Sequence, residues 1–250
     1  MGAIEIMQKA LTAMGSVKTL TYKFYSQERF KGGVIEKSEV DFKIIASPFK
    51  VYADAKLPEA AQLKYEPAKS SEVNVKKGIL KVNLKPTAGL LMKQQHNPIS
   101  RSGFAHMKKI LDKSVAARKG EDLNQFVKLI GSVNYDGKDC YKIELNDTKY
   151  GTTEYTIKEG ETIWKICEAK AIPEYKVKEL NNWMDYDDMT AGKKIKIPTS
   201  YAKKTTLYID KTTNLPIYHK MEDDKGMYET YEFKSLKLNP TLTTADFEFK

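Results

Sequence analysis

Residues 155–198 read YTIKEGETIWKICEAKAIPEYKVKELNNWMDYDDMTAGKKIKIP, and this stretch predicts a compact unit of two strands and two helices. Its opening Tyr-Thr-Ile favours a strand, Gly160 permits a tight turn, and Thr162 is a residue type that caps a helix. Pro173 is tolerated in a first helical turn, so a second helix is expected to begin near it. The alternation of Lys and Ile at 194–197 predicts a closing strand. The expected order is therefore strand, helix, helix, strand.

The same stretch resembles the LysM family. The matching positions are the opening Tyr-Thr-Ile, Gly-Glu-Thr-Ile-Trp at 160–164, Leu-Asn-Asn at 180–182, Gly192 and the final Lys-Ile-Pro. Two positions depart from the family pattern, because Trp183 replaces a smaller aliphatic residue and Ala191 replaces the common proline.

LysM modules bind glycans that contain N-acetylglucosamine, chiefly peptidoglycan, in a shallow groove between two loops. The resemblance implies that exposed backbone amides and carbonyls in this groove bond the acetamido groups of the glycan. A purely structural insert is the alternative. Carried over position by position, the implied glycan site consists of Gly160, Glu161, Thr162 and Ile163 on one side, with Asp188, Met189 and Thr190 opposite.

The rest of the chain predicts one α+β domain that is rich in antiparallel strands. Apolar residues repeat at helical spacing from Ile4 to Met14, so an amphipathic helix is expected at the start of the chain. The period then changes to two, which predicts a meander of strands that resumes after the 155–198 unit. Two amphipathic helical segments are expected at 104–117 and 123–129.

These strands and helices resemble a bacterial branch of the LolA-like group, which comprises periplasmic lipoprotein carriers and their relatives. The resemblance implies an incomplete antiparallel β-barrel covered by helices, with a concave face that holds acyl chains. It divides the chain into a discontinuous half-barrel domain, residues 1–152 and 200–250, and a LysM-like domain, residues 153–199, inserted in a strand connection. The matching segments are Leu-Thr-Tyr-Lys-Phe at 20–24, His-Asn-Pro-Ile at 96–99, Leu-Tyr-Ile-Asp at 207–210 and Tyr-Glu-Phe at 231–233.

Large apolar residues on the inner side of an incomplete barrel leave a cavity that a lipid tail can fill. Each methylene buried there contributes about 0.8 kcal/mol. A filled core is the alternative, because one sequence does not separate a cavity-lining aromatic residue from a packed one. The candidate lining residues are Leu20, Tyr22, Phe24, Val40, Phe42, Ile44, Phe49 and Val51.

The chain carries a formal net charge of +9, and the excess is almost entirely lysine. The lysines are spread along the predicted strands without a nucleic-acid recognition motif, so no nucleic-acid partner is expected. No run approaches the ~20 consecutive apolar residues of a membrane-spanning helix. The first residues lack signal-peptide features, so we expect that a leader has been removed and that the protein belongs to the periplasm or cell envelope. Cys140 and Cys167 are expected to be reduced and buried.

The sequence holds no familiar catalytic or cofactor motif: no Gly-x-Ser-x-Gly, no His-Glu-x-x-His, no Gly-rich phosphate loop and no Cys-x-x-Cys. His96, His106 and His219 lack metal-ligand spacing, and a hydrogen bond to a nearby loop is expected for His96. The acidic cluster at 185–188 lacks the pattern of a calcium loop. No enzyme activity, cofactor or metal is therefore expected.

The sequence thus predicts a non-enzymatic cell-envelope protein. Its half-barrel is expected to bind the acyl chain of a lipid or lipoprotein, while the LysM-like insert binds peptidoglycan. The alternative is an interaction scaffold with a filled core that docks another envelope protein. A cell-wall enzyme is a third hypothesis, and it lacks catalytic carboxylates or a nucleophile at recognisable spacing.

Overall fold

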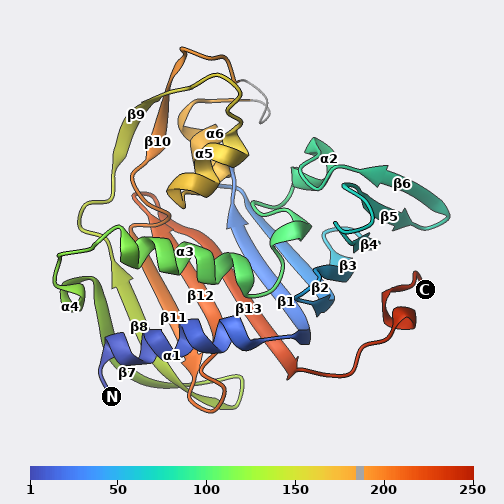
Figure 1. Ribbon diagram of the computed structural model, residues 1–250, viewed down its shortest axis with the longest axis horizontal. Coiled ribbons are helices and arrows are strands. Elements are labelled where there is room, and N and C mark those ends of the chain that lie inside the picture. The colour runs from blue at the N-terminus through green and yellow to red at the C-terminus, as the bar shows by residue number, and fades with distance from the viewer. Residues whose placement is uncertain (184–188) are drawn as a thin grey trace.

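The computed structural model describes residues 1–183 and 189–250, and an antiparallel sheet of eleven strands forms its body (Figure 1). The strand order is β6-β5-β4-β3-β2-β1-β13-β12-β11-β8-β7, so β6 and β7 are the edges of an open sheet. Its strands are β1 Thr19–Arg29, β2 Ile35–Ile45, β3 Lys50–Leu57, β4 Ala61–Tyr65, β5 Val73–Lys77, β6 Leu80–Leu84, β7 Val127–Tyr135, β8 Lys138–Asn146, β11 Lys204–Asp210, β12 Pro216–Asp223 and β13 Gly226–Leu238.

Helices cover one face of this sheet. The two longest, α1 (Ala3–Ser16) and α3 (Ala105–Ala116), contact each other and lie across it (Figure 1). The apolar stripe of α1 packs into the core, where Ile6, Met7 and Met14 are 0 to 3% exposed. The shorter helices are α2 Gly89–Met92 and α4 Leu123–Phe126, and the 3-10 turns are η1 Lys31–Gly33, η2 Ile99–Arg101 and η3 Thr244–Phe247.

The expected fold class is confirmed: the chain is α+β, with an antiparallel sheet that does not close and helices over it. The helix expected at 123–129 is wrong beyond its first turn, because α4 ends at Phe126 and β7 begins at Val127. Val127, Ile130 and Val133 are β-branched and favour a strand, and β8 supplies the partner for pairing. Across residues 1–183 and 189–250, no helix is long and apolar enough to cross a membrane.

The 155–198 stretch forms a small unit in the connection between β8 and β11, two strands that pair directly in the large sheet. The predicted order of strand, helix, helix, strand is confirmed. Thr162 caps the first helix by accepting a hydrogen bond from the backbone N–H of Lys165 at 3.3 Å. Cys140 and Cys167 are free and buried, as expected. The unit consists of β9 Thr152–Thr156, α5 Ile163–Lys170, α6 Glu174–Leu180 and β10 Lys194–Pro198, with β9 and β10 paired antiparallel.

Buried ion pairs fix this unit against the large sheet. Asp223, at the end of β12, accepts hydrogen bonds from Arg29 of β1 at 3.0 and 2.5 Å and from Lys176 of α6 at 2.7 Å. Glu174 of α6 accepts a further bond from Arg101 at 2.7 Å. The carboxylate side chains of Asp223 and Glu174 are both 2% exposed. The small unit is therefore docked on the sheet as well as joined to it by two chain connections.

Candidate functional site

A cavity of about 220 Å³ lies on the helix-covered face of the sheet. Aromatic rings form much of its wall: Tyr22 stacks on Phe42 with centroids 5.1 Å apart, and Phe24 meets Phe233 edge-on at 5.5 Å. An apolar cavity of about 150 Å³ already holds a benzene ring. This cavity therefore has room for part of a larger apolar ligand.

Half of the predicted lining residues lie on this cavity. The loop at Gly103 lies against the end of the strands that carries Ile44. A Cβ atom built on Gly103 would lie 3.4 Å from Cδ1 of Ile44. Residues near that end are consequently packed into the core. The four that line the cavity are Tyr22, Phe24, Val40 and Phe42. The four that belong to the core or its edge, and do not line the cavity, are Leu20, Ile44, Phe49 and Val51.

Helix α3 supplies lining residues that the strand pattern did not reveal. Met107, Ile110 and Leu111 face the cavity together with His106, and His219 of β12 faces it from the sheet. Burial lowers the pKa of His106 to about 3 and that of His219 to about 4. Both rings are therefore neutral at neutral pH, and they add no charge to the cavity wall.

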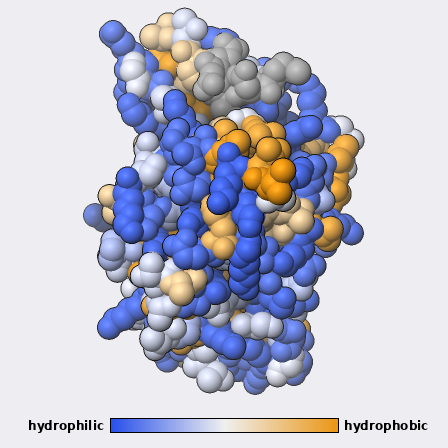
Figure 2. Space-filling model, turned by 90° about the vertical axis from the view of Figure 1, so that its right-hand side faces the viewer, coloured by the Kyte–Doolittle hydropathy of each residue, from blue (hydrophilic) through white to orange (hydrophobic). Residues whose placement is uncertain are grey.

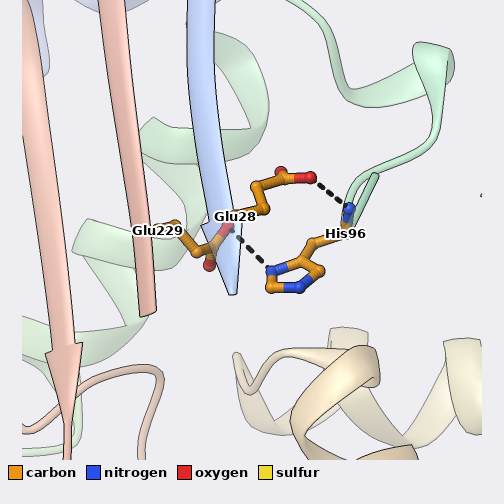
Figure 3. Close-up of side chains that lie close together, drawn as sticks. All are labelled: Glu28, His96 and Glu229. Carbon is orange, nitrogen blue, oxygen red and sulfur yellow. Dashed lines mark hydrogen bonds and ion pairs between the residues drawn. The ribbon is translucent and has the colours of Figure 1, made fainter. Parts of the chain in front are cut away.

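Three ionisable residues, Glu28, His96 and Glu229, meet beside the cavity (Figure 3). They are 3%, 2% and 0% exposed. Glu28 of β1 and Glu229 of β13 are directly opposite each other in the sheet. His96 donates its backbone N–H to Glu28 Oε2 at 2.8 Å, and its Nδ1 lies 3.7 Å from Glu229 Oε2. One possible ligand atom from each residue lies within 4.8 Å of the other two, so these residues could hold a metal ion.

Tyr231 and Asn97 orient the two carboxylates of this cluster. The Tyr231 hydroxyl lies 2.6 Å from Glu28 Oε1 and also contacts Glu229 Oε2, while Asn97 Nδ2 donates to the Tyr231 oxygen at 3.0 Å. Burial works to lower the pKa of His96, but the charges of Glu28 and Glu229 raise it overall. Burial also raises the pKa of Glu28. The hydrogen bond expected from His96 to a nearby loop is replaced by contacts with two distant strands.

The residues implied for glycan binding gather on the small unit, and several of their side chains are already engaged. The Glu161 carboxylate accepts hydrogen bonds from the Tyr155 hydroxyl at 2.7 Å and from the Lys158 backbone N–H at 2.8 Å. Ile163 is buried, Met189 is half-buried and Asp188 lies outside the described residues; Gly160, Thr162 and Thr190 are exposed. A ligand at this loop would therefore meet backbone groups more than free side chains.

Comparison with known protein families identifies the small unit. Residues 155–198 match the family described as LysM domain. This unit is a LysM domain. Its core holds Trp183, one of the two departures from the family pattern, at 8% exposed among the other buried apolar residues of the domain. No curated protein matches this chain.

Solved structures match this chain over nearly its whole length at low sequence identity. The Pseudomonas aeruginosa MucA/MucB complex matches with a TM-score of 0.45 and 9% identity, over 99% of this chain and 61% of that chain. Mycobacterium tuberculosis lipoprotein LppX matches with a TM-score of 0.44 and 14% identity, over 96% of this chain and 97% of that one. A LolA superfamily protein from Nitrosomonas europaea matches with a TM-score of 0.37 and 9% identity, over 100% and 98%.

The chain spans only 60 to 62% of the chains that it matches in the three MucB structures. Similarity at this level assigns no ligand and no partner to this protein.

Proposed function

We propose that this chain is a non-enzymatic binding protein of the periplasm or cell envelope. In this proposal residues 1–152 and 200–250 form a half-barrel domain whose cavity binds the acyl chain of a lipid or lipoprotein. Residues 153–199 form the LysM domain, which binds peptidoglycan and thereby holds the half-barrel domain at the peptidoglycan. The observation that carries the proposal is the aromatic-walled cavity of about 220 Å³ on the covered face of the sheet.

An acyl chain suits this cavity because its wall is mostly apolar and its aromatic side chains are held in place. The rings of Tyr22, Phe24 and Phe42 contact one another, so little ordering is needed when a ligand enters. Each methylene transferred from water contributes about 0.8 kcal/mol. The neutral state of His106 and His219 avoids burying an unpaired charge beside the tail. The open space supports ligand binding over a scaffold with a filled core.

The β5–β6 hairpin offers a surface that fits a lipid layer. Ile79, Leu80 and Val82 are 97%, 68% and 47% exposed; Lys81 lies between Leu80 and Val82, and Lys77 lies two residues before Ile79. Figure 2 looks at the end of the molecule that carries this hairpin and shows apolar side chains bordered by hydrophilic ones. Apolar side chains enter the headgroup boundary and lysines are attracted to anionic lipids. This combination supports uptake of a lipid from a membrane surface.

Replacing both Ile79 and Leu80 by Asp should release the protein from anionic vesicles. Flotation with vesicles of phosphatidylglycerol and phosphatidylcholine should show at least a roughly tenfold loss of bound protein. The fold should persist, because both side chains are exposed. Val34→Asp is the control, since Val34 is 54% exposed and lies between β1 and β2. Wild-type protein that stays unbound, or an Asp variant that floats equally well, would refute the lipid contact.

Replacing Gly160 by Val should abolish binding of the LysM domain to peptidoglycan. Gly160 has a φ of 71°, a conformation that strains a β-branched residue, so the exposed loop must change its backbone. Co-sedimentation with purified peptidoglycan should fall at least roughly tenfold. Gly137→Val is the matched control, because Gly137 has a φ of 74° in the turn between β7 and β8. The glycan proposal fails if wild-type protein does not sediment, or if both variants sediment equally.

A further inference from the structure

The cluster of Glu28, His96 and Glu229 contains ligand atoms that the protein itself leaves unused. Among the residues that the structure describes, both ring nitrogens of His96 and Oε1 of Glu229 are buried without a hydrogen-bond partner, and His96 Nδ1 has only the 3.7 Å contact with Glu229 Oε2. Such orphaned polar atoms cost stability unless something else bonds them. They point to a group that the polypeptide does not supply.

The placement of the two carboxylates calls for a positive charge between them. Glu28 and Glu229 face each other across β1 and β13, where like charges directly opposite are unfavourable. Both are buried away from the water that would screen them. Two arginines are engaged elsewhere: Arg29, which follows Glu28 in β1, pairs with Asp223, and Arg101 pairs with Glu174. A protonated His96 would offset one of the two carboxylate charges, whereas a divalent cation would neutralise both and leave the imidazole neutral.

We propose that Glu28, His96 and Glu229 bind one first-row divalent cation. One imidazole nitrogen and two carboxylate oxygens form a mixed donor set that suits Zn²⁺, an ion without a strict geometric preference. Bonds of about 2.0–2.2 Å would place neighbouring donor atoms roughly 3.3 Å apart. The His96 Nδ1 to Glu229 Oε2 distance is already 3.7 Å, so a small inward movement of the side chains completes the site.

The residues around the cluster resemble those that orient the ligands of a metal site through hydrogen bonds and packing. Tyr231 contacts both carboxylates and Asn97 bonds Tyr231, which fixes the direction of the carboxylate oxygens. The His96 ring stacks on Tyr175 of the LysM domain, with centroids 4.3 Å apart, which fixes the plane of the imidazole. Glu28 and Tyr231 also line the cavity, which gives the ion a path to the site.

Calorimetric titration of the full chain with Zn²⁺, after removal of metals with a chelator, tests this proposal. One Zn²⁺ should bind per chain, and a parallel titration with Mn²⁺ checks the preference for zinc. Glu229→Gln and His96→Gln should each weaken binding at least roughly a hundredfold, because each removes a ligand. Glu232→Gln is the control, since Glu232 is a half-buried glutamate of β13 outside the cluster and the cavity, and it should bind like the wild type.

Thermal unfolding keeps the proposal testable if a variant fails to fold. Saturating Zn²⁺ should raise the Tm of the wild-type protein, because an ion that binds only the folded state stabilises it. Absence of saturable Zn²⁺ and Mn²⁺ uptake by the wild type would overturn the proposal. Unchanged affinity in a folded His96→Gln variant would also overturn it. Either result would leave the three residues as a buried proton-sharing network.

Discussion

Replacing Asp223 by Ala should lower the free energy of unfolding by about 3–5 kcal/mol. The substitution removes the carboxylate that bonds both Arg29 and Lys176. It leaves the Arg29 guanidinium buried at 9% exposed without this carboxylate, while Lys176 keeps Glu179 at 3.2 Å. Arg29 belongs to the large sheet and Lys176 to the LysM domain, so the loss should also loosen the docking of the two. Urea denaturation followed by far-UV circular dichroism measures the change.

An exposed ion pair provides the control for this substitution. Asp139 pairs with Lys211 at 2.9 Å but is 67% exposed, so Asp139→Ala should change the free energy of unfolding by less than about 1 kcal/mol. Equal effects of the two substitutions would show that the buried network does not hold the LysM domain in place.

Acid should remove the contribution of Asp223 in the wild-type protein. Burial alone would raise the pKa of Asp223, but hydrogen bonds from Arg29 and Lys176 lower it overall. A carboxylate with a lowered folded-state pKa stabilises the fold above its unfolded pKa of about 3.9, and this stabilisation disappears as the pH falls through the folded value. The difference in stability between wild type and Asp223→Ala should therefore shrink below about pH 4. A constant difference down to pH 2 would contradict this account.

Replacing Val40 by Trp should weaken the binding of an acyl chain about a hundredfold. Val40 lines the cavity from β2, so a larger side chain there occupies space that the ligand needs. Displacing about four methylenes, at about 0.8 kcal/mol each, costs roughly 3 kcal/mol, which corresponds to that loss of affinity. Fluorescence titration with a fatty acid that carries an environment-sensitive dye measures the dissociation constant.

The same strand supplies the control for the Val40→Trp substitution. Lys37 lies three residues before Val40 and is exposed, on the face of β2 that points away from the cavity. Lys37→Trp should therefore bind the probe like the wild type. Equal binding by Val40→Trp and the wild type would mean that the probe occupies another place.

The LysM domain could be predicted from sequence because its signals are local. The turn at Gly160, the cap at Thr162 and the start of α6 after Pro173 each depend on residues a few positions apart. The alternating pattern of β1 and β2 likewise placed Tyr22, Phe24, Val40 and Phe42 on one face. That pattern could not show which end of the face the loop at Gly103 covers, since this depends on a segment about 80 positions away in the chain.

The buried cluster could not be predicted from spacing, because its residues come from three separated parts of the chain. Glu28 and Glu229 become neighbours only when β1 pairs with β13. One signal was present: Tyr22, Phe24, Ser26 and Glu28 alternate on the cavity face, so Glu28 is an acidic residue in an inward-facing position. An ionisable residue at such a position needs a partner, and that need was visible before the fold was known.

Native mass spectrometry of the protein, purified without detergent from a lipid-containing host, tests the acyl-chain proposal most directly. The account predicts a species heavier than the bare chain by the mass of one acyl lipid, which organic extraction releases and identifies. The Val40→Trp variant, purified in parallel, should carry much less of it. Bare chain alone, in a protein that also fails to bind the fatty-acid probe, would contradict the account and favour a docking scaffold with no lipid ligand.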